Sequence, residues 1–182
     1  MFRFLRRRAA LPAALRPRLA PGERVLAWSA VTDADADTAG EAVVVATDQG
    51  LWLPGVAERL GWHEIHKAAW SGRELRITPA EVAEERDGYT VLVDGPTVSF
   101  LLLEPGELPD QVRARVTRSV GYTVHHPLPE GAVRVVGRRV SGRDGLSWAV
   151  RYDSGTPADR PEVTELTDEL VGTARSATAP AE

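Results

Sequence analysis

The residues best suited to metal chemistry are two histidines three positions apart. The sequence His63-Glu64-Ile65-His66 resembles a zinc-protease motif, but in that motif the histidines are four positions apart and share one face of a helix. Here the surrounding residues predict a strand, in which this spacing puts the two rings on opposite faces. We therefore expect partly exposed sheet histidines without a metal. His125-His126 precedes a proline and is interpreted as a loop pair.

An acidic run has the beginning of a calcium-binding pattern. Asp33-Ala34-Asp35-Ala36-Asp37 places carboxylates at positions 1, 3 and 5 of an EF-hand loop. Such a loop then needs glycine at position 6 and glutamate at position 12, where this chain has Thr38 and Val44. The run is interpreted as a solvated acidic turn between two strands.

The sequence lacks the patterns that carry nucleophilic or phosphate chemistry. It has no cysteine, which excludes disulfides, thiol nucleophiles and cysteine-ligated metals. It also has no Gly-x-Ser-x-Gly, GxxxxGK[ST] or GxGxxG motif. We expect no catalytic residue, no cofactor and no metal, and we identify no small-molecule substrate.

Charge is distributed unevenly along the 182 residues, whose formal net charge is −4. Residues 1–18 hold six arginines and no acid, so this stretch is +6 and the remainder is −10. The stretch begins like an export signal, but its short apolar segment contains Pro12 and no cleavage site follows. No apolar run approaches the roughly 20 residues of a membrane-spanning helix. We therefore expect a cytoplasmic protein.

Two interpretations of this basic leader remain open. In the first, residues 10–18 form a short helix whose leucines pack on the main domain. In the second, the leader contacts an acidic partner or the inner face of an anionic membrane, with aromatic side chains entering the bilayer interface. The residues assigned to that contact are Phe2, Arg3, Phe4, Arg6, Arg7 and Arg8.

Short runs of β-branched and aromatic residues, separated by turn signals, predict seven strands before residue 104. The predicted strands are Arg24–Ala30, Ala42–Thr47, Leu51–Leu53, Arg59–Ile65, Glu74–Thr78, Tyr89–Val93 and Val98–Leu103. The charged stretch Pro79–Asp87 is predicted to be a loop or a single turn. Apolar residues every four positions then predict a helix over about Pro109–Val120.

A second block begins after this helix. Ala132–Val140 and Leu146–Tyr152 predict a β-hairpin, and Pro157–Asp159 is expected to open a last helix with Asp159 as its cap. Five arginines surround the hairpin, and we expect them to pair with Glu162, Glu165 and Asp168 of the last helix. The alternative is an acidic or phosphate-bearing partner. The five are Arg134, Arg138, Arg139, Arg143 and Arg151.

Three tryptophans are the candidate protein contact. Trp52, Trp62 and Trp70 occur within 19 residues, and indoles exposed together are typical of protein interfaces. The alternative is packing in the core or at a sheet edge. We expect no nucleic-acid partner.

Four segments carry a resemblance to a known fold family. They are Pro21-Gly-Glu-Arg-Val-Leu-Ala-Trp28, Val45-Ala-Thr-Asp-Gln-Gly-Leu-Trp-Leu53, Gly61-Trp-His-Glu-Ile65 and Val98-Ser-Phe-Leu-Leu-Leu103. Together with the strand count and the helix that follows, they resemble the small pleckstrin-homology-like (PH-like) proteins of high-GC bacteria. The resemblance covers about residues 20–121. It implies two nearly orthogonal sheets closed at one end by the helix, and a binding or scaffold role.

The sequence thus predicts a mainly β protein with some α structure. Residues 1–20 form the basic leader and short helix, residues 21–121 a PH-like antiparallel β-roll of about seven strands capped by a helix, and residues 122–182 a β-hairpin–helix extension. We expect a bacterial, non-enzymatic interaction or scaffold protein whose partner is a protein. The alternatives are a peripheral membrane binder that uses the leader and, last, an enzyme of unknown type.

Overall fold

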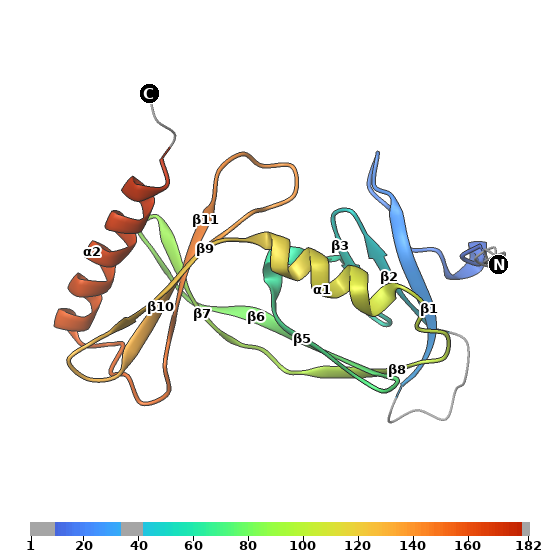
Figure 1. Cartoon of the computed structure of the whole chain (residues 1–182), viewed down its shortest axis with the longest axis horizontal. Coiled ribbons are helices and arrows are strands. Elements are labelled where there is room, and N and C mark those ends of the chain that lie inside the picture. The colour runs from blue at the N-terminus through green and yellow to red at the C-terminus, as the bar shows by residue number, and fades with distance from the viewer. Residues whose placement is uncertain (1–9, 34–41, 180–182) are drawn as a thin grey trace, which may run out of the picture.

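The computed structural model describes residues 10–33 and 42–179, and these form a mainly β structure with two helices (Figure 1). Strands β1 and β2 lie at one end of the molecule and helix α2 at the other. The helices are α1 (Leu108–Ser119) and α2 (Pro161–Ala177), and the short 3-10 turns are η1 (Ala13–Leu15) and η2 (Trp62–Glu64). The strands are β1 (Val25–Asp33), β2 (Ala42–Thr47), β3 (Gly50–Trp52), β4 (Leu60–Gly61), β5 (Ile65–Ser71), β6 (Glu74–Arg86), β7 (Tyr89–Asp94), β8 (Val98–Leu102), β9 (Val120–Pro127), β10 (Ala132–Arg138) and β11 (Ser147–Tyr152).

One open sheet connects the described strands in the order β4-β3-β2-β1-β8-β6-β7-β11-β10-β9, and β5 pairs with β6 outside this path. Strand β6 joins the two halves of the sheet. Its residues Glu74–Ile77 lie between β5 and β8, whereas Ala80–Arg86 pair with β7. The pairing of β11 with β7 is parallel, and it attaches the predicted hairpin to the rest of the sheet.

The two halves of the sheet have separate cores. The first core lies between α1 and the first half, and Val44, Leu51, Ile65, Leu102 and Leu108 are fully buried in it. The second core lies between α2 and the second half, which consists of β7, β11, β10, β9 and the Ala80–Arg86 part of β6. Tyr89 and Val91 of β7 belong to this second core.

The prediction of a loop over Pro79–Asp87 was wrong, because β6 continues through this charged stretch to Arg86. Its side chains are mostly exposed, so no apolar alternation marks it as a strand, and pairing with β7 stabilises it instead. Pro79 is tolerated beside an irregularity in the β5–β6 register. With β4 and β5 separate, eight strands precede α1 instead of the expected seven.

Two other predicted segments differ in the structure. The histidine pair interpreted as a loop lies in β9, which pairs with β10 over its whole length. The last helix begins at Pro161 with Arg160 at the N-cap position, and it has no side-chain cap from Asp159. Proline suits the first helical position because its missing N–H has no intrahelical partner there.

The leader is described from residue 10 onward, and the expected helix over residues 10–18 reduces to the single 3-10 turn η1. Pro12 and Pro17 flank this turn and prevent a longer helix, since proline donates no backbone hydrogen bond. Leu15 and Pro17 instead line a hollow with Val43, Val45 and Trp52 on the outer face of β2 and β3. None of the described helices is long and apolar enough to cross a membrane.

Candidate functional site

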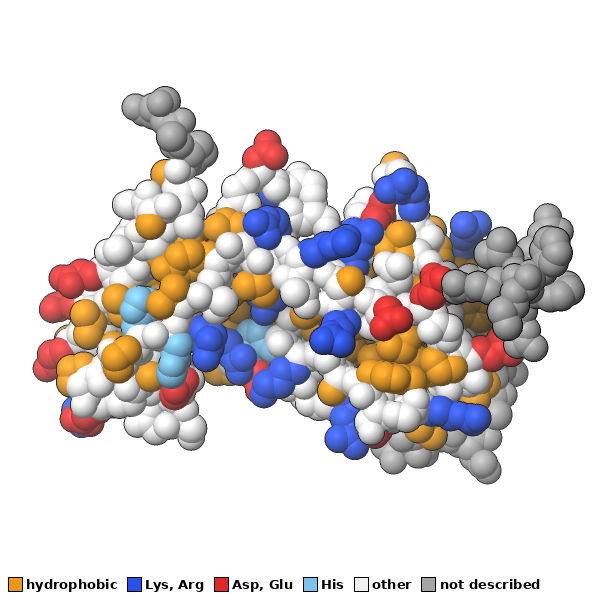
Figure 2. All heavy atoms as spheres, in the orientation of Figure 1, with side chains coloured by type: hydrophobic (Ala, Val, Ile, Leu, Met, Phe, Trp, Pro, Cys, Tyr) orange, Lys and Arg blue, Asp and Glu red, His pale blue; other side chains and the backbone are white. Residues whose placement is uncertain are grey.

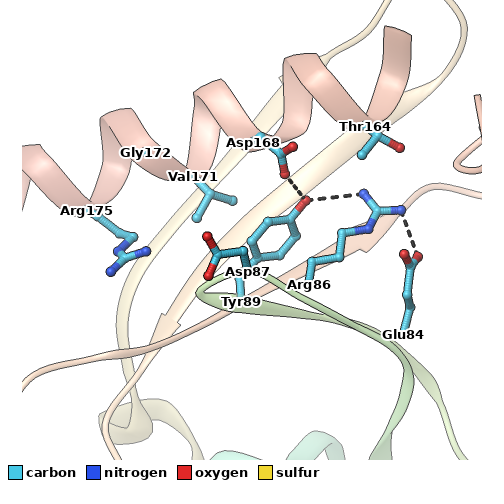
Figure 3. Close-up of a pocket in the computed structure, with 9 residues that line it drawn as sticks. All are labelled: Glu84, Arg86, Asp87, Tyr89, Thr164, Asp168, Val171, Gly172 and Arg175. Atoms are coloured by element: carbon cyan, nitrogen blue, oxygen red, sulfur yellow. Dashed lines mark hydrogen bonds and ion pairs between the residues drawn. The ribbon is translucent and has the colours of Figure 1, made fainter. Parts of the chain in front are cut away.

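A polar hollow of about 410 Å³ lies between α2 and the hairpin formed by β6 and β7 (Figure 3). The Tyr89 hydroxyl donates a hydrogen bond to Asp168 Oδ1 of α2 at 2.6 Å. Arg86 Nη1 donates to the same Tyr89 oxygen at 3.2 Å, and Arg86 Nη2 donates to Glu84 Oε2 at 2.8 Å. The residues that line the hollow are Glu84, Arg86, Asp87, Tyr89, Thr164, Asp168, Val171, Gly172 and Arg175.

The charged and polar groups of this hollow belong to one hydrogen-bonded network. Burial, together with the hydrogen bond to Asp168, raises the pKa of Tyr89 to about 12. The hydrogen bond to Glu84 raises the pKa of Arg86, against an opposing effect of burial. The hydrogen bonds connect Glu84, Arg86, Tyr89 and Asp168 in one series, and this series holds α2 against the β6–β7 hairpin.

A second tyrosine fixes the same helix. Arg86 Nη1 also donates to the Tyr152 hydroxyl at 3.0 Å, and that hydroxyl donates to Thr167 Oγ1 of α2 at 2.9 Å. Arg86 Nη2 reaches the carbonyl oxygen of Ala158, just before α2, at 3.3 Å. These bonds determine which face of α2 meets the sheet.

The orientation of α2 leaves one flank directed toward β9. Val163, Thr167, Val171 and Ala174 are buried against the sheet, and Asp168 marks the flank above the β6–β7 hairpin. Each residue of an α-helix is rotated by about 100° from the one before it, so Leu166 and Leu170 lie on the flank of α2 opposite Asp168. Both leucines are only partly buried. Because β6 and β9 are at opposite edges of this half of the sheet, these leucines are on the flank of α2 nearer β9.

Strand β9 is the last strand of the sheet path, and among the described residues it pairs only with β10. Its register places Val124 opposite Val135, a core residue, so Tyr122, Val124 and His126 belong to the face that α2 covers. Val124 is nevertheless 36% exposed. Figure 2 shows hydrophobic side chains and two histidines next to one another over this end of the molecule. The unpaired edge of β9 and the two leucines of α2 together form what we call the β9 groove.

On the face of the sheet that points away from α2, the back face, a row of basic side chains begins at β9 and continues across β10 and β11. His125 lies opposite Arg134 of β10, and Arg134 lies opposite Arg151 of β11, so the three form one row across three strands. His125 Nε2 is 2.9 Å from Asp153 Oδ2, and Arg151 Nη2 is 2.6 Å from Asp94 Oδ1. Arg134 is exposed and has no carboxylate within ion-pair distance among the described residues.

The opposite edge of this half of the sheet is formed by β6 and is charged. The Ala80–Arg86 part of β6 carries exposed Glu81, Glu84 and Glu85 on its edge. Charged side chains on an edge strand disfavour pairing with another chain. Strand β9, with the sequence Val-Gly-Tyr-Thr-Val-His-His-Pro, has no Asp, Glu, Lys or Arg. Of the two edges, β9 is therefore the one suited to accept a further strand.

The three tryptophans predicted as a protein contact lie in three different environments. Trp62 is buried in the first core and donates from Nε1 to the Thr47 carbonyl oxygen at 3.2 Å. Trp52 is partly buried and donates to Glu23 Oε1 at 3.0 Å. Trp70 is 39% exposed and lines a hollow beside the start of α1. The structure does not gather them into one patch.

The prediction of two partly exposed sheet histidines is confirmed only in part, since His63 is partly exposed but not in a strand and His66 is in a strand but not exposed at its side chain. His63 lies in η2, and His66 lies on β5 with its side chain almost fully buried. Burial lowers the pKa of both rings. His66 Nδ1 is 2.9 Å from Asp94 Oδ1, and Lys67 Nζ is 2.7 Å from the other oxygen of that carboxylate. The described residues contain no group of three His, Asp or Glu that could hold a metal ion.

The expected pairing of the hairpin arginines with α2 was also wrong. Alternation along β10 turns Val133 and Val135 toward α2, so Arg134 and Arg138 lie on the back face. Arg138 donates to Ser119 Oγ at 2.9 Å and to the Ile65 carbonyl oxygen at 3.4 Å. Arg139 donates to the carbonyl oxygens of Arg118 and Val120 at the end of α1.

Several predicted contact residues lie outside the described residues. Among them are all six assigned to membrane or acidic-partner contact, which are Phe2, Arg3, Phe4, Arg6, Arg7 and Arg8. The same holds for Asp35 and Asp37 of the acidic run.

Sequence reasoning missed the β9 groove. The alternation of Val120, Tyr122 and Val124 was available as a strand signal, but glycine, threonine and the histidine pair weakened it. Leu166 and Leu170 were predicted to lie on the apolar stripe of the last helix. Their partial exposure depends on how α2 is rotated over the sheet.

The fold and the site define a mainly β protein with an open sheet, two cores and an unprotected edge strand beside a helix. Comparison of the chain with protein-family models, with curated proteins and with solved structures gave no match.

Proposed function

We propose that this protein is a non-enzymatic interaction or scaffold protein that binds a partner protein by accepting an extended segment of it along β9. The observation that carries the proposal is the unpaired edge of β9, which has no Asp, Glu, Lys or Arg, next to the partly exposed leucines of α2. An exposed sheet edge supplies main-chain hydrogen bonds to an incoming strand, and adjacent apolar pockets select its side chains.

The test uses an octapeptide in which valine alternates with threonine, called here the Val–Thr peptide, matched to the eight residues of β9. We expect fluorescence anisotropy to show binding, and amide hydrogen exchange to slow in β9 when the peptide is bound. The same peptide with N-methyl groups on alternate amides should not bind, because strand addition needs those N–H donors.

Val124→Lys is the blocking variant, since lysine on an edge strand opposes pairing. Val56→Lys is its matched control, because Val56 is an exposed valine outside the second half of the sheet. We expect Val124→Lys to abolish binding of the Val–Thr peptide and Val56→Lys to leave it unchanged. Equal binding by both variants would exclude β9 as the site.

For the fold of residues 21–121 we propose the PH-like roll that the sequence resembles. Support comes from the antiparallel strands of the first half of the sheet and from α1, which covers their core. The parallel β11–β7 pair ties this region to the second core. An experimental structure in which β1–β8 do not form two nearly orthogonal sheets would contradict the assignment.

A second candidate function is contact with the inner face of an anionic membrane through the basic leader. The end of the leader is attached to the first half of the sheet through Glu23, whose Oε2 accepts from the Ala20 amide at 2.8 Å and whose Oε1 accepts from Thr47 of β2 at 2.6 Å. Each basic residue near such a surface contributes about 1 kcal/mol. We expect the full chain to float with phosphatidylserine vesicles, and its Arg6→Glu/Arg7→Glu/Arg8→Glu variant to remain unbound. Equal flotation of both would exclude the leader as the anchor.

A further inference from the structure

We infer that the segment accepted by β9 alternates apolar and acidic residues, with its apolar side chains on the α2 face and its acidic side chains on the back face. The inference rests on the proposed strand addition and names the chemistry of the partner. Alternation follows from geometry, because successive side chains of any added strand point to opposite faces of the sheet.

The α2 face of the β9 groove requires apolar residues. An added strand lies about 4.8 Å beyond β9 and places every second side chain next to Val124 and Tyr122. On the same face Leu166 and Leu170 of α2 are partly exposed. Apolar side chains here remove the remaining surface of these residues from water, which is favourable in proportion to the area covered.

The back face requires acidic residues. An added strand is two strand spacings, or about 10 Å, from β10, and the side chains of a glutamate and of Arg134 together span that distance. Arg134 is the member of the basic row without a carboxylate partner among the described residues. His125 and Arg151 already face Asp153 and Asp94. An incoming carboxylate therefore pairs with Arg134, the one cation of the row that faces no carboxylate among the described residues.

The same charges disfavour a second copy of this chain as the occupant. Two β9 strands paired with each other would add a second Arg134 but, among the described residues, no carboxylate free to pair with it, because Asp153 and Asp94 already face His125 and Arg151. Like charges placed in this way oppose association and favour a partner of opposite sign. A foreign segment with acids at alternate positions satisfies both faces.

The experiment compares three octapeptides with the full chain by fluorescence anisotropy. Valine alternates with threonine, with glutamate or with lysine, giving the Val–Thr, Val–Glu and Val–Lys peptides. We expect the Val–Glu peptide to bind about fivefold more tightly than the Val–Thr peptide at low salt, as one well-placed exposed ion pair allows, and the Val–Lys peptide to bind more weakly. Added salt should reduce the difference.

Arg134→Glu should reverse the preference to the Val–Lys peptide, and Arg134→Gln should abolish it. Arg73→Glu is the matched control, because Arg73 is exposed between β5 and β6 in the first half of the sheet. It should leave the preference for the Val–Glu peptide unchanged.

The possible failures are distinguishable. Equal affinity for the Val–Glu and Val–Lys peptides, with the Val–Thr peptide still bound, overturns the acidic alternation and leaves strand addition intact. Absence of binding by all three peptides overturns the proposed function and the inference with it. A dimer in sedimentation that Val124→Lys dissociates identifies a second copy as the occupant and also overturns the inference.

Discussion

Tyr89 and Asp168 are 79 positions apart in the chain, yet the tyrosine hydroxyl lies 2.6 Å from the carboxylate (Figure 3). This bond joins β7 to α2 across the second core. It also fixes the rotation of α2 that leaves Leu166 and Leu170 beside the edge of β9. The candidate site therefore depends on a contact at the far side of the helix.

Tyr89→Phe removes this bond and the one from Arg86. We expect the free energy of unfolding to fall by about 1–2 kcal/mol, because two hydrogen bonds are lost, one of them to a carboxylate. Urea denaturation measures the change. Tyr122→Phe is the matched control, since no hydrogen bond of the Tyr122 hydroxyl to a described residue is present. An equal loss in both variants would contradict the assigned role.

The protein should lose stability at high pH because of Tyr89. The pKa of Tyr89 is about 12 in the folded chain, above its usual value of 10. The unfolded chain therefore releases this proton first, so the contribution is fully present below pH 10 and is lost as pH rises through 12. We expect a loss of about 2 kcal/mol over this interval. Urea denaturation at several pH values tests it, and the steepness of the decline should be smaller in Tyr89→Phe.

Glu23 links the leader to three strands or loops of the first half. Its buried carboxylate accepts hydrogen bonds from Thr47, Trp52, Arg59 and the Ala20 amide. Burial raises the pKa of Glu23, but these bonds and the Arg59 charge outweigh it, so the pKa lies below its usual value.

Glu23→Gln should therefore destabilise the protein by about 2 kcal/mol at neutral pH, because charge-assisted bonds are lost. This contribution is present above pH 4.5 and is lost as pH falls through the folded pKa, so the two proteins should converge in acid. Thermal unfolding at several pH values measures it. The exposed Glu58→Gln is the control, and a similar loss there would contradict the role of Glu23.

Gly137 allows a close approach of side chains in the second core. A Cβ atom at this position would lie 2.8 Å from Leu146 Cδ1 and 3.2 Å from Trp148 Cη2. Gly137→Ala should therefore cost about 1–3 kcal/mol and disturb the edge-to-face contact of Tyr122 with Trp148. Near-ultraviolet circular dichroism and urea denaturation report both effects.

Gly172→Ala is the control for Gly137→Ala, because it adds the same methyl group at a position with free space. Gly172 lies within α2, and a Cβ atom there would meet nothing within 4 Å. The substitution should stabilise the protein by up to about 1 kcal/mol, since alanine favours a helix. Destabilisation by both alanines would show that packing around α2 differs from the structure.

Two neighbouring residues of α2 should separate stability from binding. Val171 is 2% exposed in the second core, so Val171→Ala should cost about 1–3 kcal/mol. Leu170 is partly exposed on the β9 flank, so Leu170→Ala should cost less stability but weaken binding of the Val–Thr peptide more than Val171→Ala does. The reverse order in anisotropy measurements would contradict the placement of the groove.

Much of the fold follows from local patterns. Short runs of β-branched and aromatic residues predicted β2 and β7, and four-residue spacing predicted α1 to within one residue at each end. The hairpin of β10 and β11 was predicted for the same reason. These elements consist of apolar runs or of apolar residues at a regular short spacing, and both signals are visible in the sequence.

The elements that sequence reasoning missed have no such signal. The second part of β6 is charged and exposed, and β9 combines glycine, threonine and histidine. Both are strands because the next strand in the chain pairs with them, and not because their own residues form an apolar pattern. The ion pairs of the arginines were mispredicted for a related reason, because the face of β10 that meets α2 depends on the register of the whole sheet.

By itself the sequence determined that the protein is mainly β, that it has two amphipathic helices, and that its positive charge is concentrated at the start of the chain. Those properties depend on residue type and short spacing. Only the tertiary structure decided that the sheet is open, that β9 is its last strand, and that an exposed arginine and two partly exposed leucines lie on the two faces beside it. Strand order and helix rotation arise from contacts between residues far apart in the chain, and short-range periodicity carries no information about them.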